Sequence, residues 1–563
     1  MNRRSLLVSL SAAGVAAFGN RSGAQTLDAV RPSPLFEPWR FGAAGDGKAL
    51  DSPAINRAID ACTQAGGGVV YLRPGTYRSG TVILKSNVTL YLEAGALILG
   101  SFDLRDYTPQ PGPPQLGDAN QTHLIYARNA ENINLAGPGR IDGQGSHFWE
   151  LSGRPPLSPD DQWAEVAAHA WKKKSTGRPS PMLEFVECRW LRIEDVRIEN
   201  AAGWTLRPLN CDNVFIRGIS ITNPNIGPNT DGLDLTGCQN VFVSDCMIDT
   251  GDDAICLKSE NHYGPEPRLA RNIVVTNCTL TTCCNGFKLG TATQGGFENI
   301  TFSNSVIYNK EGEFKDRVIA GIALEAVDGG WIEGVVITGI RMQRTRTPIF
   351  LRLGDRSRPH AYAKNGIRNV MIEDIHASEA LLASSITGIP GKSIEDVTLS
   401  NLRIDNVLPS RPEWPSRSLP EKEKGYPEAR MFGMMPVYGL YVRHAVGITL
   451  RDISLRSTSQ ENRPAIYLED VQTARIENLT AAIITGAEPV ISLKNASSVS
   501  ICNSTAPRAT EFFLHAEGDH TSDILVANCD LRKTTNVLTP TSVAGAVDLH
   551  NNISGKKAAP ASS

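Results

Sequence analysis

Apolar and polar residues alternate with a period of two in short segments that recur along most of the chain. The four clearest copies begin at Asn213, Asn240, Asn272 and Asn299, and each continues as a run rich in Val, Ile and Thr. Alternation in short β-branched runs predicts strands. Successive copies start about 30 residues apart, a period that predicts a solenoid.

Weaker copies continue as far as Ile524, and the strands recur with a period of roughly 22 to 36 residues, except where the Pro-rich segment 409–436 interrupts them. We therefore predict an all-β fold, a right-handed parallel β-helix in which each coil buries its inward side chains against the neighbouring coils. A β-propeller is excluded because its blades need about 40 to 50 residues and hairpin pairs.

Helical periodicity is clear only from Ser52 to Cys62, where Ile55, Ala58, Ile59 and Cys62 share one face. We expect this short helix to cap the N-terminal end of the solenoid and to protect its open edge.

The segment 1–25 has the features of an export signal. Arg3 and Arg4 precede an apolar run from Leu6 to Phe18, and small residues follow at 22–24. That run is too short to span a bilayer core of about 30 Å, and no second long apolar run predicts a membrane anchor. We expect a twin-arginine signal at 1–25, with an ordinary secretory signal as the alternative. We further predict a single catalytic β-helix domain at 26–554 and a disordered tail at 555–563. The export signal implies a periplasmic or extracellular protein.

Composition narrows the possible functions. Hydrophobic residues make up 41 % of the chain and the formal net charge is −3, which excludes global disorder and gives no attraction to nucleic acid. The 11 cysteines form no pair with the spacing of a zinc site. Cys246 and Cys278 occupy the same position in two repeats, so we expect buried thiols. We predict a monomer that needs no cofactor.

Two acidic segments stand out from the repeat, Asn229-Thr230-Asp231 and Gly251-Asp252-Asp253. When Leu233 and Leu235 are aligned with Ile255 and Leu257, the two segments are one coil apart and Asp231 lies over Asp253. Adjacent coils of a β-helix are about 4.8 Å apart. Asp231, Asp252 and Asp253 should therefore form one carboxylate cluster.

Such a cluster suits the cleavage of glycosidic bonds. Like charges at short distance raise at least one carboxyl pKa, which provides a protonated acid beside an ionised carboxylate. Single aspartates often cap turns instead. A calcium site is a second functional interpretation, although the spacing of its oxygen ligands matches no EF-hand. Those ligands would be Asn229, Asp231, Asp234, Asp252 and Asp253.

These motifs, together with Phe41-Gly-Ala-Ala-Gly-Asp-Gly-Lys48 and the glycine-rich segments at 66–77 and 137–145, resemble glycoside hydrolase family 28, which degrades pectin. The resemblance covers roughly positions 39 to 530. It implies an inverting mechanism without a metal. It also implies that Asp252 is the general acid, and that Asp231 and Asp253 position and deprotonate the attacking water. Asn229 would contribute to substrate binding.

The chain departs from the family pattern in the following coils. The family has a Gly-His pair and then an Arg-Ile-Lys triplet, which hold a galacturonate carboxylate. Here Asn285 stands in place of the histidine, Ala323 in place of the arginine and Glu325 in place of the lysine. Ordinary endo-polygalacturonase activity is therefore in doubt.

Two cations are candidates to replace those residues. If Leu235, Leu257, Leu289, Leu324 and Leu353 form one buried column, the residues before them form an outward column in which Lys288 and Arg352 flank Ala323. We predict that Lys288 and Arg352 bind an anionic sugar; the alternative is that both are solvated surface charges. Lys258 shares a column with Glu325, and the two could form a salt bridge beside the cleft or be simply structural.

The sequence therefore predicts a secreted hydrolase of plant cell-wall pectic polysaccharides. The Pro-rich segment 409–436 contains Gly425-Tyr426-Pro427, which we expect to fold over the cleft as an aromatic wall and to favour exo-cleavage. A calcium-dependent polysaccharide lyase and a non-catalytic glycan-binding β-helix remain as alternatives.

Overall fold

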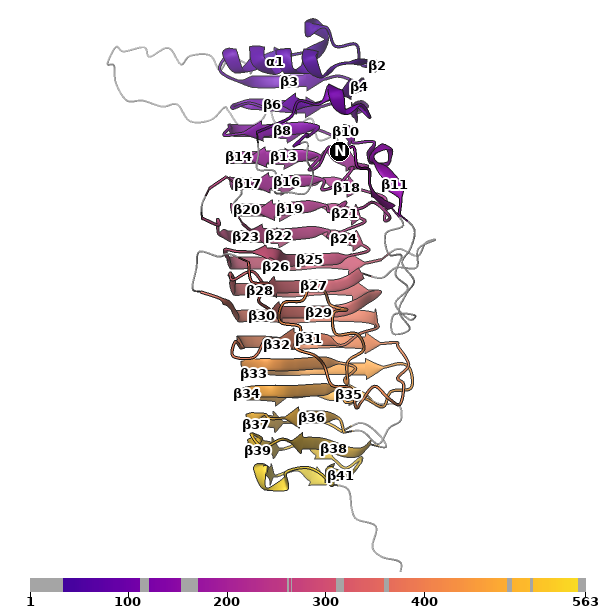
Figure 1. Cartoon of the computed structure of the whole chain (residues 1–563), viewed down its shortest axis with the longest axis vertical. Coiled ribbons are helices and arrows are strands. Elements are labelled where there is room, and N and C mark those ends of the chain that lie inside the picture. Colours follow the sequence, from indigo (N-terminus) through magenta and orange to yellow (C-terminus); the bar gives the residue numbers. More distant parts are fainter. Residues whose placement is uncertain are drawn as a thin grey trace, which may run out of the picture.

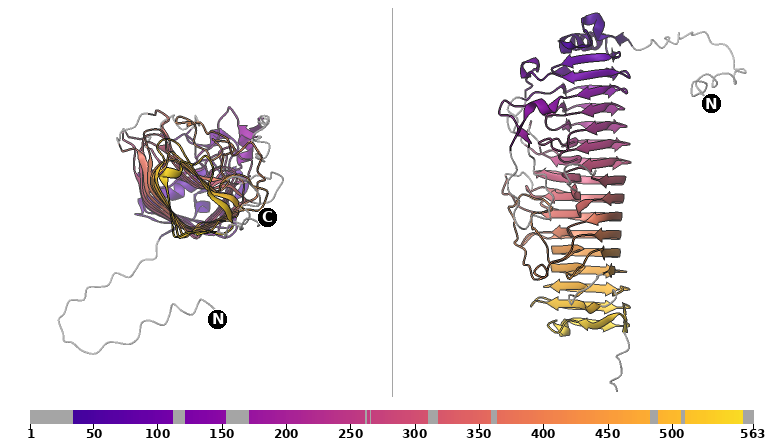
Figure 2. Two further views of the ribbon diagram at one scale, coloured as in Figure 1. Left: turned by 90° about the horizontal axis from the view of Figure 1, so that it is seen from below. Right: turned by 90° about the vertical axis from the view of Figure 1, so that its right-hand side faces the viewer.

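The computed structural model describes residues 34–111, 121–152, 171–260, 263–264, 266–309, 318–358, 364–482, 489–506 and 510–554. The predicted signal peptide and C-terminal tail lie outside these residues. The chain winds repeatedly around one long axis as a right-handed parallel β-helix, so that successive coils lie on top of one another (Figure 1). Figure 2 shows the same stack from the side and along its axis. The predicted fold class is confirmed.

Each coil contributes to three stacks of parallel strands. The first stack, which carries the acidic motifs, consists of β5 (Val82–Ile83), β8 (Ile125–Arg128), β13 (Leu183–Val186), β16 (Leu206–Leu209), β19 (Leu233–Thr236), β22 (Ile255–Ser259), β25 (Asn285–Thr293), β27 (Val318–Ala326), β29 (Thr345–Leu353), β31 (Ser384–Thr387), the starts of β33 (Leu440–Ser457) and β34 (Ile466–Glu477), β36 (Ile491–Lys494), β38 (Thr510–Glu517) and β41 (Thr534–Leu538).

The second stack carries the sequence repeat. It consists of β1 (Leu35–Phe36), β3 (Gly68–Leu72), β6 (Val88–Leu92), β9 (Glu131–Ala136), β14 (Arg189–Glu194), β17 (Asp212–Arg217), β20 (Gln239–Ser244), β23 (Ala270–Thr276), the starts of β26 (Gly296–Tyr308), β28 (Trp331–Gln343), β30 (Gly366–Ala380) and β32 (Ile394–Asn406), the later parts of β33 and β34, β37 (Ser497–Cys502), β39 (Ser522–Ala527) and β42 (Val547–His550).

The third stack closes each coil. It consists of β2 (Asp46–Leu50), β4 (Gly75–Ser79), β7 (Ala96–Gly100), β10 (Arg140–Asp142), β15 (Arg197–Glu199), β18 (Ser220–Thr222), β21 (Met247–Thr250), β24 (Thr279–Thr282), the ends of β26, β28, β30, β32 and β33, β35 (Thr480–Ala482), β40 (Asp530–Leu531) and β43 (Ile553–Ser554). Outside the stacks, β11 (Trp149–Leu151) and β12 (Trp171–Lys173) form an antiparallel pair.

The asparagines that begin the sequence repeat have a backbone role near the start of the second-stack strands. Asn213, Asn240, Asn272 and Asn299 all have positive φ values, between 55° and 57°. Asparagine adopts this left-handed conformation more readily than most other residues with a side chain. The side-chain amide of Asn272 donates to Asn240 (3.0 Å) and that of Asn299 to Asn272 (3.2 Å), so the asparagines also form a hydrogen-bonded ladder.

The inward side chains form one continuous apolar core along the axis. The helix α1 (Ser52–Gln64) buries Ile55, Ala58, Ile59 and Cys62 against the first coils, as predicted. It covers the N-terminal end of the solenoid (Figure 1). None of the helices within the described ranges has the length and apolarity needed to cross a membrane. All 11 cysteines lie in those ranges as free thiols, and the predicted burial of Cys246 and Cys278 is confirmed.

The first stack is also covered on its outward face. In β22, β25, β27 and β29 every residue except Thr291 is buried, whichever way it points. The covering comes partly from the segment 407–439 between β32 and β33, which folds back across β29, β31 and β33 (Figure 1). Polar groups on this face therefore lie in a largely water-excluded environment, where charges interact strongly.

Candidate active site

The two acidic motifs occupy the turns that lead into β19 and β22. Leu233 pairs with Ile255 and Leu235 with Leu257, which confirms the predicted alignment of the two segments. The backbone N–H of Gly232 donates to the carbonyl of Asp253 (2.9 Å). Asp231 and Asp253 therefore lie on adjacent coils at the same point of the turn.

These turns are tight because neighbouring backbones approach two glycines closely. A Cβ atom on Gly232 would lie 2.5 Å from the carbonyl oxygen of Ala254, and one on Gly251 would lie 2.7 Å from Oγ1 of Thr230. The hydroxyl of Thr230 accepts from the N–H of Gly251 (3.2 Å) and donates to the carbonyl of Gly227 (3.0 Å). The two turns are thus joined to each other, which fixes the relative positions of the aspartates.

Asp253 is a carboxylate surrounded by hydrogen-bond donors. Its Oδ1 accepts from the side-chain amide of Asn285 (2.7 Å) and from the backbone N–H of Asn285 (3.2 Å), and Nζ of Lys288 lies 3.0 Å from its Oδ2. Burial alone would raise the pKa of Asp253. The charges of Lys288 and Lys258 and the hydrogen bonds from Cys284 and Asn285 outweigh burial, and the pKa lies below its ordinary value. Asp253 is therefore ionised.

Asp231 has the opposite surroundings. It is 5 % exposed, and its buried Oδ1 has no hydrogen-bond partner among the described residues. Burial raises its pKa well above the ordinary value, and the charges of Asp252, Asp234 and Asp253 raise it further, while Lys258 opposes them. The two stacked aspartates are therefore unequal: Asp253 is held as an anion and Asp231 favours its protonated form.

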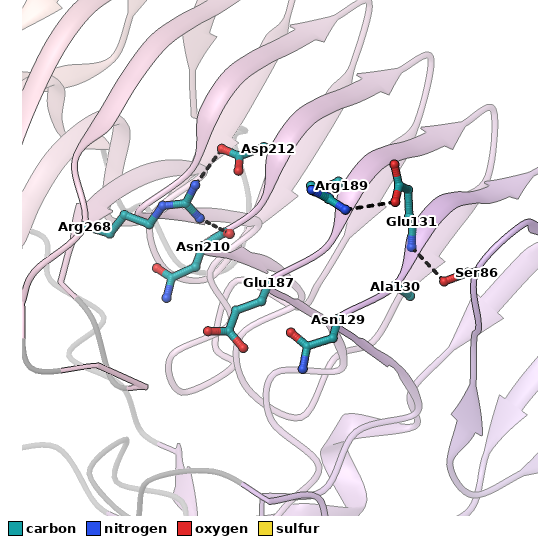
Figure 3. Close-up of a pocket in the computed structure, with 9 residues that line it drawn as sticks. All are labelled: Ser86, Asn129, Ala130, Glu131, Glu187, Arg189, Asn210, Asp212 and Arg268. Carbon is teal, nitrogen blue, oxygen red and sulfur yellow. Dashed lines mark hydrogen bonds and ion pairs between the residues drawn. The ribbon is translucent and has the colours of Figure 1, made fainter.

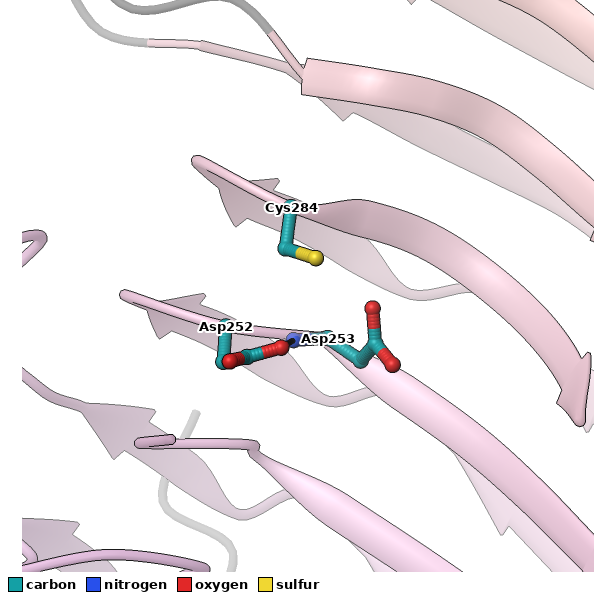
Figure 4. Close-up of side chains that lie close together, drawn as sticks. All are labelled: Asp252, Asp253 and Cys284. Atoms are coloured by element: carbon teal, nitrogen blue, oxygen red, sulfur yellow. Dashed lines mark hydrogen bonds between the residues drawn. The ribbon is translucent and has the colours of Figure 1, made fainter. Parts of the chain in front are cut away.

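Asp252 is the most accessible of the three carboxyls, with intermediate burial. Its Oδ1 accepts from the backbone N–H of Asp253 (2.8 Å), and its carbonyl accepts from the hydroxyls of Thr250 and Thr282, both at 2.6 Å. Figure 4 shows Asp252 and Asp253 side by side, with the Cys284 thiol on the next coil directed toward them. Ligand atoms of these three residues lie within 4.8 Å of one another, an arrangement that could hold a metal ion. The ammonium of Lys288 already supplies a positive charge on one side of the cluster.

A buried ion pair extends the cluster along β19 and β22. Nζ of Lys258 lies 2.6 Å from Oδ1 of Asp234, 2.9 Å from Sγ of Cys256 and 4.8 Å from the centre of the Trp204 ring. Burial raises the pKa of Asp234, and Lys258 opposes that shift. The suggested salt bridge between Lys258 and Glu325 is wrong. Lys258 lies across from Thr236 and reaches diagonally to Asp234, which is two residues away on the same face of β19.

Glu325 pairs instead with Lys288, whose Nζ lies 3.8 Å from its Oε2. Lys288 therefore lies between two carboxyls, Asp253 and Glu325. Burial raises the pKa of Glu325 to about 8, even though Lys288 acts in the opposite direction. Lys288 is 4 % exposed, so the alternative prediction that it is a solvated surface charge is wrong.

The predicted position of Arg352 is also wrong. Leu324 pairs with Leu351, not with Leu353, so Arg352 lies beside Glu325 and Phe350 occupies the position beside Ala323. The shift by two arises because Leu351 and Leu353 both point inward, and strand alternation does not distinguish between them. Arg352 is 1 % exposed and donates to the carbonyls of Gly388 (3.0 Å), Glu421 (2.8 Å) and Lys422 (3.1 Å).

Arg352 therefore holds the Pro-rich segment over the first stack, as does Arg443, which donates to the carbonyls of Leu419 (2.9 Å) and Pro420 (3.1 Å). This segment brings Tyr426 close to the acidic cluster, as predicted. Lys288 lowers the pKa of the Tyr426 hydroxyl, but burial and the charges of Asp253 and Glu325 outweigh it and raise that pKa to about 12. The residue as a whole is 61 % exposed, so a face of the ring remains open.

Asn229 lies at the rim, where it is exposed and has a φ of 53°. Its Oδ1 accepts from Nη2 of Arg178 (3.3 Å), and Arg178 also donates to the carbonyls of Ala202 (2.9 Å) and Pro228 (2.5 Å). Arg178 thus fixes the turn before Asp231. Sequence reasoning missed it because it is distant from that turn along the chain and belongs to no repeat.

On the N-terminal side of the cluster, Glu184 and Arg207 form another fully buried pair on β13 and β16. His123 joins it, with Nε2 lying 2.8 Å from Glu184. Beyond this pair, Tyr263 packs on Tyr126, Val186 and Leu209, and its hydroxyl donates to the carbonyl of Pro111 (3.4 Å). The outward face of the first stack is therefore covered on both sides of the acidic cluster.

A separate polar pocket lies at the opposite ends of the strands, where β8, β13 and β16 turn into the second stack (Figure 3). It has a volume of about 550 Å³, and its lining includes Arg189 paired with Glu131 and Arg268 paired with Asp212. The described residues that line it include none of the predicted site residues.

Comparison with known proteins agrees with this geometry. The profile of glycosyl hydrolases family 28 matches residues 115–413, and a profile described as rhamnogalacturonase A/epimerase, pectate lyase-like, matches residues 39–96. A probable polygalacturonase from Vitis vinifera is 26 % identical over 381 residues, which cover 65 % of this chain and 73 % of that protein. An exo-poly-alpha-D-galacturonosidase from Dickeya chrysanthemi is 26 % identical over 441 residues, with 69 % and 71 % covered.

Among solved structures, an exopolygalacturonase from Thermotoga maritima superimposes with a TM-score of 0.53 at 24 % identity, covering 67 % of this chain and 89 % of that one. This likeness concerns the fold. The family profile spans more than half of the sequence and includes both acidic motifs. The chain therefore belongs to glycosyl hydrolases family 28 and is a glycoside hydrolase.

Proposed function

We propose that the protein hydrolyses glycosidic bonds in pectic polysaccharides of the galacturonan or rhamnogalacturonan type, with inversion at the anomeric carbon. The observation that carries this proposal is the contrast between Asp253, which its donors hold as an anion, and the neighbouring pair of Asp231 and Asp252. Burial and the charge of Asp252 raise the pKa of Asp231, so this pair retains a proton. Hydrolysis with inversion needs one protonated and one ionised carboxyl in the same site. The similarity to a probable polygalacturonase from Vitis vinifera and an exo-poly-alpha-D-galacturonosidase from Dickeya chrysanthemi supports the substrate class.

The roles follow from accessibility and charge. Asp231 and Asp252 interact through their charges, so the proton held by this pair belongs to both residues. When the proton is on Asp252, the accessible carboxyl protonates the leaving oxygen as general acid. Asp231 and Asp253 then hold the attacking water, and Asp231 accepts its proton. Asp253 orients the water as a fixed anion, because Lys288 and Asn285 occupy its other positions.

We propose exo-action at the end of a glycan chain. The segment held by Arg352 and Arg443 crosses the first stack on one side of the cluster, and Tyr263 with Pro111 covers it on the other. A polymer needs a groove that is open at both ends in order to be cleaved internally. The two coverings support a short substrate site, in which the open face of Tyr426 can stack on a sugar ring.

We also propose that the protein is exported in a folded state, to act in the periplasm or outside the cell. The arginine pair before the apolar run supports a twin-arginine signal. The free state of all 11 cysteines is consistent with folding in a reducing compartment before export.

The experiment that tests the function is product analysis on oligogalacturonides, rhamnogalacturonan fragments and xylogalacturonan. The proposal expects saturated products released one end unit at a time. A lyase would instead give unsaturated uronates that absorb in the ultraviolet, and a glycan-binding protein would give no products.

A further inference from the structure

Building on the proposed function, we infer that the sugar unit bound over β22, β25 and β27 is neutral. The enzyme would then cleave where the glycan places a neutral sugar, and not a uronate, beside the acidic cluster. The cations and carboxyls of this face determine which charge a ligand can carry there, because most of them already contact other groups of the protein.

The carboxyls outnumber the cations within the described part of the cluster. The carboxyls of the cluster are Asp231, Asp234, Asp252, Asp253 and Glu325. Lys258 and Lys288 are the ammonium groups that contact them, and the charges of Arg207 and Arg356 also act on Asp234 and Glu325. Burial and mutual repulsion already raise the pKa values of Asp231, Asp234 and Glu325. A uronate in the same place would add a further negative charge to a site where burial and repulsion already disfavour the existing negative charges.

Both lysines are buried and lie against carboxyls of the protein. The ammonium of Lys258 contacts Asp234, the thiol of Cys256 and the face of Trp204, which accounts for its three N–H groups. Lys288 lies between Asp253 and Glu325. The two residues are 7 % and 4 % exposed, so neither presents a free ammonium to a ligand.

The arginines of this face are also turned toward the protein. Arg352 and Arg443 donate to backbone carbonyls of the covering segment, and the Phe432 ring lies 5.4 Å from one guanidinium and 5.8 Å from the other. They are 1 % and 2 % exposed. A bidentate clamp on a substrate carboxylate needs two free N–H groups on one edge of the guanidinium. Here backbone carbonyls and, for Arg443, the Glu421 carboxylate already contact the terminal N–H groups.

Three carboxyl oxygens of the cluster have no hydrogen-bond partner within the described residues. Oδ1 of Asp231, Oδ2 of Asp234 and Oε2 of Glu325 are buried oxygens without a hydrogen-bond partner in the described part of the chain. Asp252 is the most accessible carboxyl of the cluster, and its oxygens can accept hydrogen bonds from sugar hydroxyls, whereas a carboxylate on the ligand offers only acceptors. The acceptor-rich carboxyl cluster therefore suits the hydroxyl groups of a neutral sugar.

The test measures binding separately from turnover. Trigalacturonic acid and its carboxyl-reduced counterpart have the same linkages and differ only in the group at C6. Their affinities for the Asp252→Asn variant, measured by calorimetry, should differ at least tenfold in favour of the reduced sugar. The affinity for the reduced sugar should also change less than twofold between low and high salt, because screening acts on charged ligands.

At pH 9, above the pKa of about 8 of Glu325, Glu325→Gln removes one of the opposing charges and should narrow this preference at least threefold, when combined with Asp252→Asn. Glu395→Gln, on the exposed side of β32, is the matched control and should leave the preference unchanged. Tighter binding of trigalacturonic acid that weakens with salt would overturn the inference, as would failure of both sugars to bind. A neutral preference without hydrolysis of any pectic glycan by the wild-type enzyme would contradict the proposed function and still support this inference.

Discussion

Nζ of Lys288 lies 3.0 Å from Oδ2 of Asp253, and both side chains are only 5 % exposed. Neither charge is stable alone in such a place, because burial disfavours each of them. The pair therefore determines the ionisation of Asp253, and through it the position of the water that attacks the sugar.

Removal of this cation should move the pH profile. In Lys288→Met, burial of Asp253 is no longer opposed at short range, so the pKa of Asp253 should rise. The acid limb of the kcat/KM profile should shift to higher pH, and activity at pH 5 should fall about 10²- to 10³-fold, as for loss of a charge at a reacting centre. Lys494→Met, which breaks the more exposed pair with Glu469, is the control. An unchanged acid limb would show that Lys288 does not govern the cluster.

The general acid can be tested with a nearly isosteric change. Asp252→Asn keeps the shape of the side chain but removes the transferable proton, so kcat should fall about 10²- to 10⁴-fold. The melting temperature should hardly change, because Asp252 is the least buried carboxyl of the three. Asp245→Asn is a matched control at an exposed turn, where φ is 59° and asparagine fits. Full activity in Asp252→Asn would exclude this residue as the acid.

Glu325 should make the folded state sensitive to pH. Its pKa is raised from 4.5 to about 8, so the folded protein retains a proton that the unfolded chain releases. The stabilisation from this group is complete below pH 4.5 and is lost as the pH rises through about 8. Glu325→Gln should therefore reduce the fall in melting temperature between pH 5 and pH 8 by about 1–3 °C. Parallel curves for the two proteins would contradict the raised pKa.

Substitution of Arg352 tests whether this residue has a structural role or binds the substrate. Arg352→Met leaves the carbonyls of Gly388 and Glu421 without this donor, at a cost of about 1–3 kcal/mol for the buried Gly388 group, whereas Lys422 keeps the N–H of Gly425. The melting temperature should fall, and KM should rise by the same factor for acidic and neutral substrates. A rise in KM confined to acidic substrates would instead show that Arg352 binds a carboxylate.

Chelation should have little effect. Asp252, Asp253 and Cys284 are close enough to share a metal ion, but Lys288 already places a positive charge beside Asp253. We expect activity after EDTA treatment and dialysis to remain within twofold of the untreated enzyme. Loss of activity that added Ca²⁺ restores would favour the lyase alternative.

Much of the fold and of the central cluster could be predicted from the sequence. The asparagines of the repeat mark corners that need a positive φ, and the leucine and isoleucine pairs fix the alignment that stacks Asp231 on Asp253. Alternation with a period of two is unchanged when a strand slides by one full period, which is why the sequence alone assigns Arg352 to the wrong column. Partners reached by long covering segments, such as the carbonyls of Glu421 and Lys422, leave no local pattern in the sequence.

The most direct test of the central claim follows the anomeric proton signals by NMR while the wild-type enzyme and the Asp252→Asn variant act on a panel of pectic oligosaccharides. The account predicts that the wild-type enzyme first releases the anomer opposite to that of the cleaved bond, and that the variant releases almost none. Retention of configuration, unsaturated products, or equal rates for the two proteins would contradict it.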